Sequence, residues 1–162
     1  MHSPVPALAR ALTALSNILT KAEAHAEARK IEPAALLQFR LFPDMLDFTR
    51  QVQLTCDFCV RAAARLSGGD VPSFPDVETS IAELQTRIAT AQTYLQGVNT
   101  AAFEGAEGRE IVLAQRSGEM RMNGQDYYSL YSLPQVYFHL TTAYDILRHN
   151  GVEVGKRDYM GA

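Results

Sequence analysis

The chain has 162 residues, of which 47% are hydrophobic, and a formal net charge of −3 at pH 7. This length and apolar content predict one globular domain, residues 1–162, that folds around its own core without a disulfide or a metal. They exclude an intrinsically disordered chain. Because positive and negative charges are interspersed, the chain also lacks the strong positive field that a nucleic acid partner requires.

No stretch of the sequence approaches 18 consecutive apolar residues, so we expect no membrane span and no membrane partner. The uncharged run at residues 11–20 has no basic segment before Arg10 and contains hydroxyl and amide side chains. A secretion signal has a basic start and a continuous apolar stretch. We therefore expect a cytoplasmic protein.

Apolar residues at steps of three and four predict a first helix over residues 4–28, with Ser3 as its N-cap. A short helical turn is expected at residues 33–37. A second long helix is predicted to start at Pro43, because proline is well tolerated only in the first turn, and its apolar stripe extends to Leu66. The following glycine pair is typical of a helix end.

The connection at residues 70–74 contains a proline and is short, which favours an antiparallel return to a third helix. Ser73 or Asp76 can cap this helix. Its apolar stripe, from Val77 to Val98, has the heptad-like spacing of helices that pack in bundles.

The apolar period then changes. Residues 110–115 and 119–123 are short, rich in extended-type residues and joined through residues 116–118, which predicts a small β-hairpin. A hairpin of two strands is marginal in water, so we expect it to pack on the helices or on a partner chain.

A fourth helix is predicted to be introduced by residues 126–132 and to become regular from Leu133 to Asn150. The tail, residues 153–162, is polar and has no strong periodicity. These elements predict an all-α protein: an up-down four-helix bundle with a small β-hairpin between its third and fourth helices.

The C-terminal run at residues 133–161 resembles the signature end of the DUF1993 family of uncharacterised bacterial proteins. Residues 41–45, 50–53 and 62–66 resemble the second helix of that family, so the resemblance covers nearly the whole chain. It implies a four-helix bundle of the DinB/YfiT type. Many members of that superfamily hold a divalent metal through three histidines and act as thiol-dependent transferases, isomerases or hydrolases.

The three histidines do not carry over to this sequence. In the metal-binding relatives the last helix presents two histidines four residues apart, whereas here His139 is followed by Ala143. The second predicted helix contains no histidine, and its nearest competent side chains are Asp44, Gln53 and Asp57. The metal site implied by the resemblance is therefore absent or rebuilt, and His139 is the one candidate metal ligand.

Candidate pocket residues follow from the same helices. His139 lies mid-helix beside the core stripe, and we favour a partly buried histidine bonded to a neighbour over a metal ligand. Tyr137 and Tyr144 flank it and can donate hydrogen bonds to a ligand, although buried tyrosines are more often core residues. Asp44 follows Pro43 at a predicted helix start, where the helix dipole alone stabilises a carboxylate.

Cys56 and Cys59 form an isolated CxxC motif. A structural zinc needs four ligands and a thioredoxin-type motif lies at a strand-to-helix turn, whereas here the helical period continues through both residues. We expect two buried, apolar cysteines.

Two functions remain open. The first is a binding or assembly protein on a bundle that has lost the three-histidine site. The alternative is a metal-dependent enzyme of the thiol transferase or hydrolase type, with Zn²⁺ or Ni²⁺ held by His139 with Asp44 or Asp57 and a tyrosine near it. The sequence identifies no small-molecule ligand and no cofactor.

A homodimer is also expected, because several apolar residues supply more apolar surface than a monomer needs to expose, and a symmetric dimer would cover it. These are Phe39, Leu41, Phe42, Ile111, Leu113, Met120 and Met122.

Overall fold

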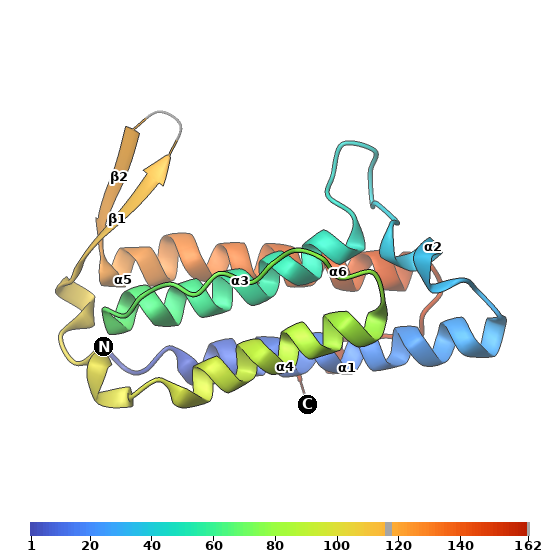
Figure 1. The fold of residues 1–162 in the computed structure, drawn as a ribbon, viewed down its shortest axis with the longest axis horizontal. Coiled ribbons are helices and arrows are strands. Elements are labelled where there is room, and N and C mark those ends of the chain that lie inside the picture. The colour runs from blue at the N-terminus through green and yellow to red at the C-terminus, as the bar shows by residue number, and fades with distance from the viewer. Residues whose placement is uncertain (116–117, 162) are drawn as a thin grey trace.

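The computed structural model describes residues 1–115 and 118–161, and four long helices form its body (Figure 1). These helices are α1 (Val5–Arg29), α3 (Phe48–Ser67), α4 (Ile81–Gly97) and α6 (Leu133–His149). The predicted helical bundle with a small hairpin before its last helix is confirmed. The short α2 (Pro33–Leu37) lies where a helical turn was expected.

Helix α3 begins at Phe48, so the predicted start at Pro43 is wrong. The Asp47 side chain accepts a hydrogen bond from the Arg50 backbone N–H at 2.9 Å, which caps the helix. Pro43 instead lies in a turn in which the Met45 N–H donates to the Phe42 carbonyl. A proline is compatible with a first helical turn but does not require one, and the side-chain cap decides the boundary.

Helix α4 likewise starts later than predicted, at Ile81, with Ser80 rather than Ser73 or Asp76 as its cap. Val77, assigned to the apolar stripe, is 70% exposed. Residues 68–80 form an extended crossover that runs along α3 back to the end at which α3 starts (Figure 1).

The crossover makes α3 and α4 parallel, so the expected antiparallel return is wrong. Asp76 and Glu78, at the end of the crossover, bind Arg50 and Gln53 in the first turns of α3. These contacts place the start of α4 beside the start of α3. The helices therefore run up, down, down and up, an arrangement that helical bundles achieve with a long crossover.

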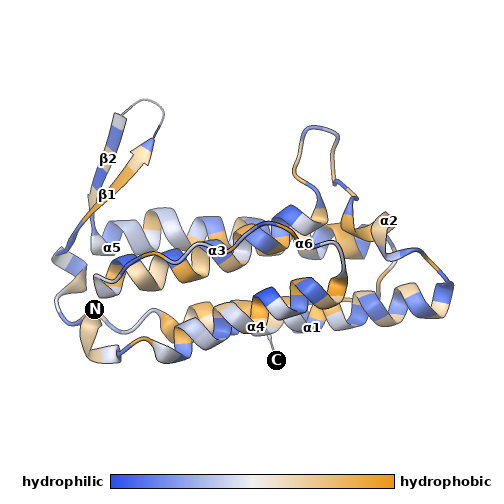
Figure 2. Cartoon of the chain, in the orientation of Figure 1, coloured by the Kyte–Doolittle hydropathy of each residue, from blue (hydrophilic) through white to orange (hydrophobic). Residues whose placement is uncertain are grey.

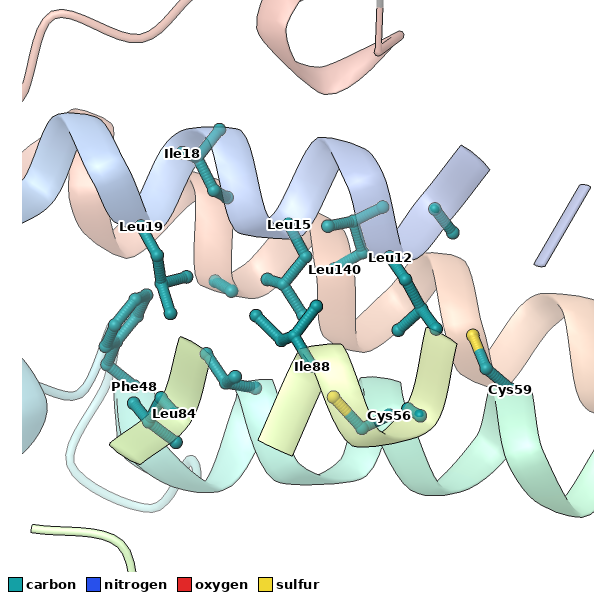
Figure 3. Packing of buried hydrophobic residues seen from close by; sticks show 14 of the residues in the cluster. Leu12, Leu15, Ile18, Leu19, Phe48, Cys56, Cys59, Leu84, Ile88 and Leu140 are labelled. Carbon is teal, nitrogen blue, oxygen red and sulfur yellow. The ribbon is translucent and has the colours of Figure 1, made fainter. Parts of the chain in front are cut away.

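Apolar faces of all four helices meet in one core (Figure 3). In Figure 3, Leu15 of α1 points toward Ile88 of α4, and Leu19 of α1 points toward Phe48 at the start of α3. The Gln85 side chain of α4 also donates to the Ser16 carbonyl of α1 at 2.9 Å. The bundle thus buries the apolar stripes of its helices together, while α6 also exposes Tyr137 and Phe138.

The hairpin consists of β1 (Glu110–Gln115) and β2 (Gly118–Asn123), which pair antiparallel; the turn expected at residues 116–117 lies outside the described residues. It projects from one end of the bundle, and β1 is more hydrophobic than β2 (Figure 2). Ile111 and Leu113 are buried in a second cluster with Leu66, Phe103 and Tyr127.

This second cluster changes the argument for a dimer, because Ile111 and Leu113 are covered within the chain. Phe39 is also partly buried against the main core, whereas Phe42 remains 63% exposed and Leu41 39% exposed. Of the seven apolar residues named for a dimer, Leu41 and Phe42 are therefore the two that are exposed, and the homodimer stays a prediction.

Two short helical segments, α5 (Gly124–Asp126) and the π-helical turn η3 (Tyr127–Ser132), lead into α6, as predicted. The tail has more structure than expected: Val152 and Val154 are buried, and α7 (Lys156–Tyr159) lies against α1. Across residues 1–115 and 118–161, no helix has both the length and the hydropathy needed to cross a membrane.

Candidate functional site

His139 lies between α6 and α3 and is only 7% exposed. Its Nδ1 is 2.8 Å from Oε1 of Gln51 on α3. The Gln51 amide nitrogen donates to the Leu46 carbonyl at 3.1 Å, so the oxygen of that side chain faces the ring and Nδ1 carries the proton. The ring also stacks on Phe58, with 5.6 Å between centroids and 8° between planes.

These surroundings keep His139 neutral. Burial, assisted by the positive charge of Arg50, lowers its pKa from 6.5 to about 4. Four residues along the same helix face, Ala143 is fully buried and offers no ligand atom. The ring is therefore held by an amide and an aromatic neighbour.

Asp57 and Gln53 belong to a different arrangement, centred on Arg87 of α4. The Arg87 guanidinium donates to Asp57 at 2.6 Å and to Glu78 at 2.8 Å, and Gln53 donates to Glu78 at 2.7 Å. Burial alone would raise the pKa of Glu78, but the hydrogen bonds from Arg87 and Gln53 outweigh it and hold that pKa below its ordinary value. We call Arg87, Asp57, Asp76, Glu78 and Gln53 the Arg87 cluster.

The Arg87 cluster ties the crossover to α3 and α4. Arg87 is 4% exposed, and it also binds Asp76 at 3.0 Å and the Pro75 carbonyl at 3.0 Å. The second oxygen of Asp57 accepts from Arg61 at 2.9 Å. Both carboxylate oxygens of Asp57 thus have partners, and its role here is to bind arginine.

Asp44 was expected at a helix start, but it is exposed in the turn before α3. Tyr144 is half-buried and meets Tyr159 edge-to-face, with 5.9 Å between ring centroids. Within the described ranges, no group of three histidine, cysteine, aspartate or glutamate side chains is arranged to hold a metal ion. The structure thus separates the predicted residues: His139 pairs with Gln51, and Asp57 and Gln53 serve the Arg87 cluster.

Cys56 and Cys59 are both free and fully buried. Figure 3 shows their sulfur atoms on the side of α3 that faces the core. Burial raises the pKa of both thiols well above the ordinary value. A thiolate is the reactive form of cysteine, so this pair is suited to packing and not to nucleophilic chemistry.

A cavity of about 600 Å³ opens between α1, α6 and α7. It is lined by Pro6, Ala7, Arg10, Ala11, Tyr137, Leu140, Tyr159 and Met160. Its size falls within the range of small-molecule sites, and its walls combine apolar surface with a few polar groups, as such sites do.

The polar groups of the cavity are Arg10, Tyr137 and Tyr159. Arg10 donates through Nε to the Met160 carbonyl at 2.7 Å, and no carboxylate in residues 1–115 and 118–161 forms an ion pair with it. The Tyr159 hydroxyl accepts from Thr141 at 3.0 Å. Burial and the neighbouring Tyr159 raise the pKa of Tyr137, with Arg10 opposing, so its phenol stays protonated and can donate.

Sequence reasoning found Tyr137 but missed Arg10 and Tyr159. Arg10 is a charged residue outside the apolar steps of three and four in its helix, and Tyr159 lies in a tail without periodicity. Arg87 was also missed, although its position three residues after Leu84 and four before Ala91 places it on the core side of the stripe. A charged residue at such a position requires a buried partner, which is a usable signal.

The chain is similar to known proteins along almost its whole length. A crystal structure described as a DinB family member protein from Shewanella denitrificans superposes with a TM-score of 0.91 at 43% sequence identity, covering 98% of this chain and 89% of that one. No curated protein matches the chain significantly. The family described as "Domain of unknown function (DUF1993)" matches residues 2–160. The chain belongs to the DUF1993 family and has the fold of a DinB family member.

Proposed function

We propose that the protein is a binding protein that has lost the three-histidine metal site of its superfamily and takes up a small molecule in the cavity between α1, α6 and α7. One observation carries this proposal. The buried polar side chains of α3 bond to His139 of α6 and to Arg87 of α4, whereas the cavity presents hydrogen-bond donors over an apolar wall.

The residues at the expected metal position do not fit a metal ion. A histidine ligand needs further ligands within about 2–3 Å of the same ion. The ring of His139 instead faces Gln51 and Phe58, and Ala143 occupies the position of the second histidine. The residues around His139 therefore favour the binding protein over the metal-dependent enzyme.

A calorimetric titration with Zn²⁺, Ni²⁺ and Mn²⁺ tests the loss of the metal site. We expect no saturable binding at one ion per chain and no rise in melting temperature. One equivalent of metal that is bound by the unmodified chain and lost in His139→Gln would contradict the proposal.

Uptake of a small molecule is tested with N-phenyl-1-naphthylamine, an uncharged probe that fluoresces in apolar sites. We expect saturable binding of one probe per chain. Ala7→Leu fills the cavity wall and should abolish the signal, whereas Ala89→Leu makes the same change on the exposed face of α4 and should not. Absence of probe binding, or equal binding by Ala7→Leu at an unchanged melting temperature, would overturn the proposal.

A further inference from the structure

We infer that the cavity between α1, α6 and α7 selects a small apolar monocarboxylate, with Arg10 binding the carboxylate and the apolar wall covering the rest of the ligand. This inference rests on the proposed function and adds the chemical class of the ligand. Charge, wall composition and the fixed position of α7 support it in turn.

The charge of the cavity lining comes from one arginine, Arg10. Arg10 is the single cation of the lining, and no acidic side chain lines the cavity with it. Its Nε donates to the Met160 carbonyl at 2.7 Å, which orients the guanidinium while both terminal nitrogens remain for a ligand. A guanidinium binds a carboxylate through paired hydrogen bonds, so charge complementarity favours an anion of that shape.

The rest of the lining indicates an apolar ligand body of modest size. Ala7, Ala11 and Leu140 are among its lining residues, and Met160 of the tail, itself 43% exposed, also lines it. Polar and multiply charged ligands would lose hydration against these side chains without gaining partners. One guanidinium matches one negative charge, and this favours a monocarboxylate over a phosphate with two.

The donors beside Arg10 are held in place before a ligand arrives. Thr141 donates to the Tyr159 hydroxyl at 3.0 Å, so the hydroxyl hydrogen of Tyr159 is left to donate elsewhere. Lys21 pairs with Asp158 at 2.7 Å and donates to the Glu153 carbonyl at 3.2 Å, which fastens α7 to α1. A wall that is already ordered lowers the entropic cost of binding.

The test is displacement of N-phenyl-1-naphthylamine by octanoate and by 1-octanol, which share the apolar body and differ in the carboxylate. Three forms of the chain are compared: unmodified, Arg10→Met and Arg148→Met. Arg148 donates to the Val154 carbonyl at 2.9 Å, so it also bonds the C-terminal segment but does not line the cavity. Arg148→Met therefore controls for a merely structural effect on the tail.

We expect Arg10→Met to weaken octanoate about tenfold, the effect of roughly one charge-assisted hydrogen bond, and to leave octanol within about twofold. Arg148→Met should change neither ligand. Octanoate affinity that is indifferent to Arg10→Met, an equal loss for both ligands, or failure of octanoate to displace the probe would overturn the inference. Each of these results is distinct from failure of the probe itself to bind, which would overturn the proposed function.

Discussion

The two sides of α3 show opposite ways of burying polar groups. Toward α4, Asp57 forms ion pairs with Arg87 and, through its second oxygen, with Arg61, so opposite charges lie side by side. Toward α6, Gln51 meets a neutral His139, and the pair carries no charge. The two arrangements depend on different physical terms: the first needs charge pairing and the second needs the ring to stay unprotonated.

The two arrangements have different roles: one determines the direction of a helix, and the other holds a side chain in position. The Arg87 cluster brings Asp76 and Glu78 to α3 and thereby sets the direction of α4, which is a structural task. The Gln51–His139 pair fixes the ring at the position where the superfamily resemblance places a metal ligand. None of these side chains lines the cavity between α1, α6 and α7.

Removing the charge of Arg87 should have the largest effect. Arg87→Met keeps much of the apolar stem but leaves the half-buried Glu78 without its cation and the buried Asp57 with Arg61 alone, which costs about 3–5 kcal/mol of unfolding free energy. Urea denaturation measures this change. Arg121→Met, which removes an exposed arginine bound to Glu110 and Glu119, should change stability little. Equal effects of the two variants would show that the Arg87 cluster does not hold the crossover.

The long-range character of this cluster explains what sequence reasoning missed in the fold. Apolar stripes predicted all four long helices, because each stripe is a local pattern. The direction of α4 depends on Asp76 meeting Arg50, 26 residues away, and no local pattern contains that contact. The start of α3 was predicted wrongly for a related reason. Pro43 permits a helix to start there, but the side-chain cap by Asp47 determines where the helix begins.

The candidate site was predictable only in part for the same reason. Tyr137 was singled out, and the absence of a second histidine at Ala143 was visible in the sequence. The cavity itself forms where Arg10, near the start of the chain, meets Met160 near its end, a separation of 150 residues. Side chains brought together over such a distance have no shared sequence pattern.

Lowering the pH should destabilise the protein through His139. In the unfolded chain the pKa is near 6.5, and in the folded chain it is about 4, so below pH 6.5 the unfolded state binds a proton that the folded state does not. Stability is unaffected by this group above pH 6.5, falls from there to about pH 4, and loses about 3 kcal/mol over that window. Denaturation at pH 7, 6 and 5 measures the slope.

The matched variants for this slope are His139→Gln and His149→Gln. The first removes the buried ring and should flatten the fall between pH 6.5 and 5, where few carboxylates titrate. The second removes an exposed histidine at the end of the same helix and should leave the fall in place. A slope that persists in His139→Gln would mean that another group causes it.

Breaking the neutral pair from the Gln51 side should cost less. Gln51→Leu leaves the Nδ1–H of His139 without its acceptor, and we expect a loss of about 1–3 kcal/mol. Combining Gln51→Leu with His139→Phe removes both polar groups, so the double variant should be more stable than the sum of the two single losses predicts. Additive losses in this cycle would contradict a direct hydrogen bond between the two side chains.

The smallest expected effect concerns the wall of the cavity. Lys21→Met removes the ion pair with Asp158 and the bond to the Glu153 carbonyl, and a surface pair of this kind contributes at most about 1 kcal/mol. The free energy of global unfolding should barely change. Amide hydrogen exchange should rise selectively in residues 156–160, because the side-chain bonds from Arg10 and Thr141 are then what still holds this segment. Exchange that rises equally in α3 would show instead that the tail and the core unfold together, and the cavity wall would then be as rigid as the bundle.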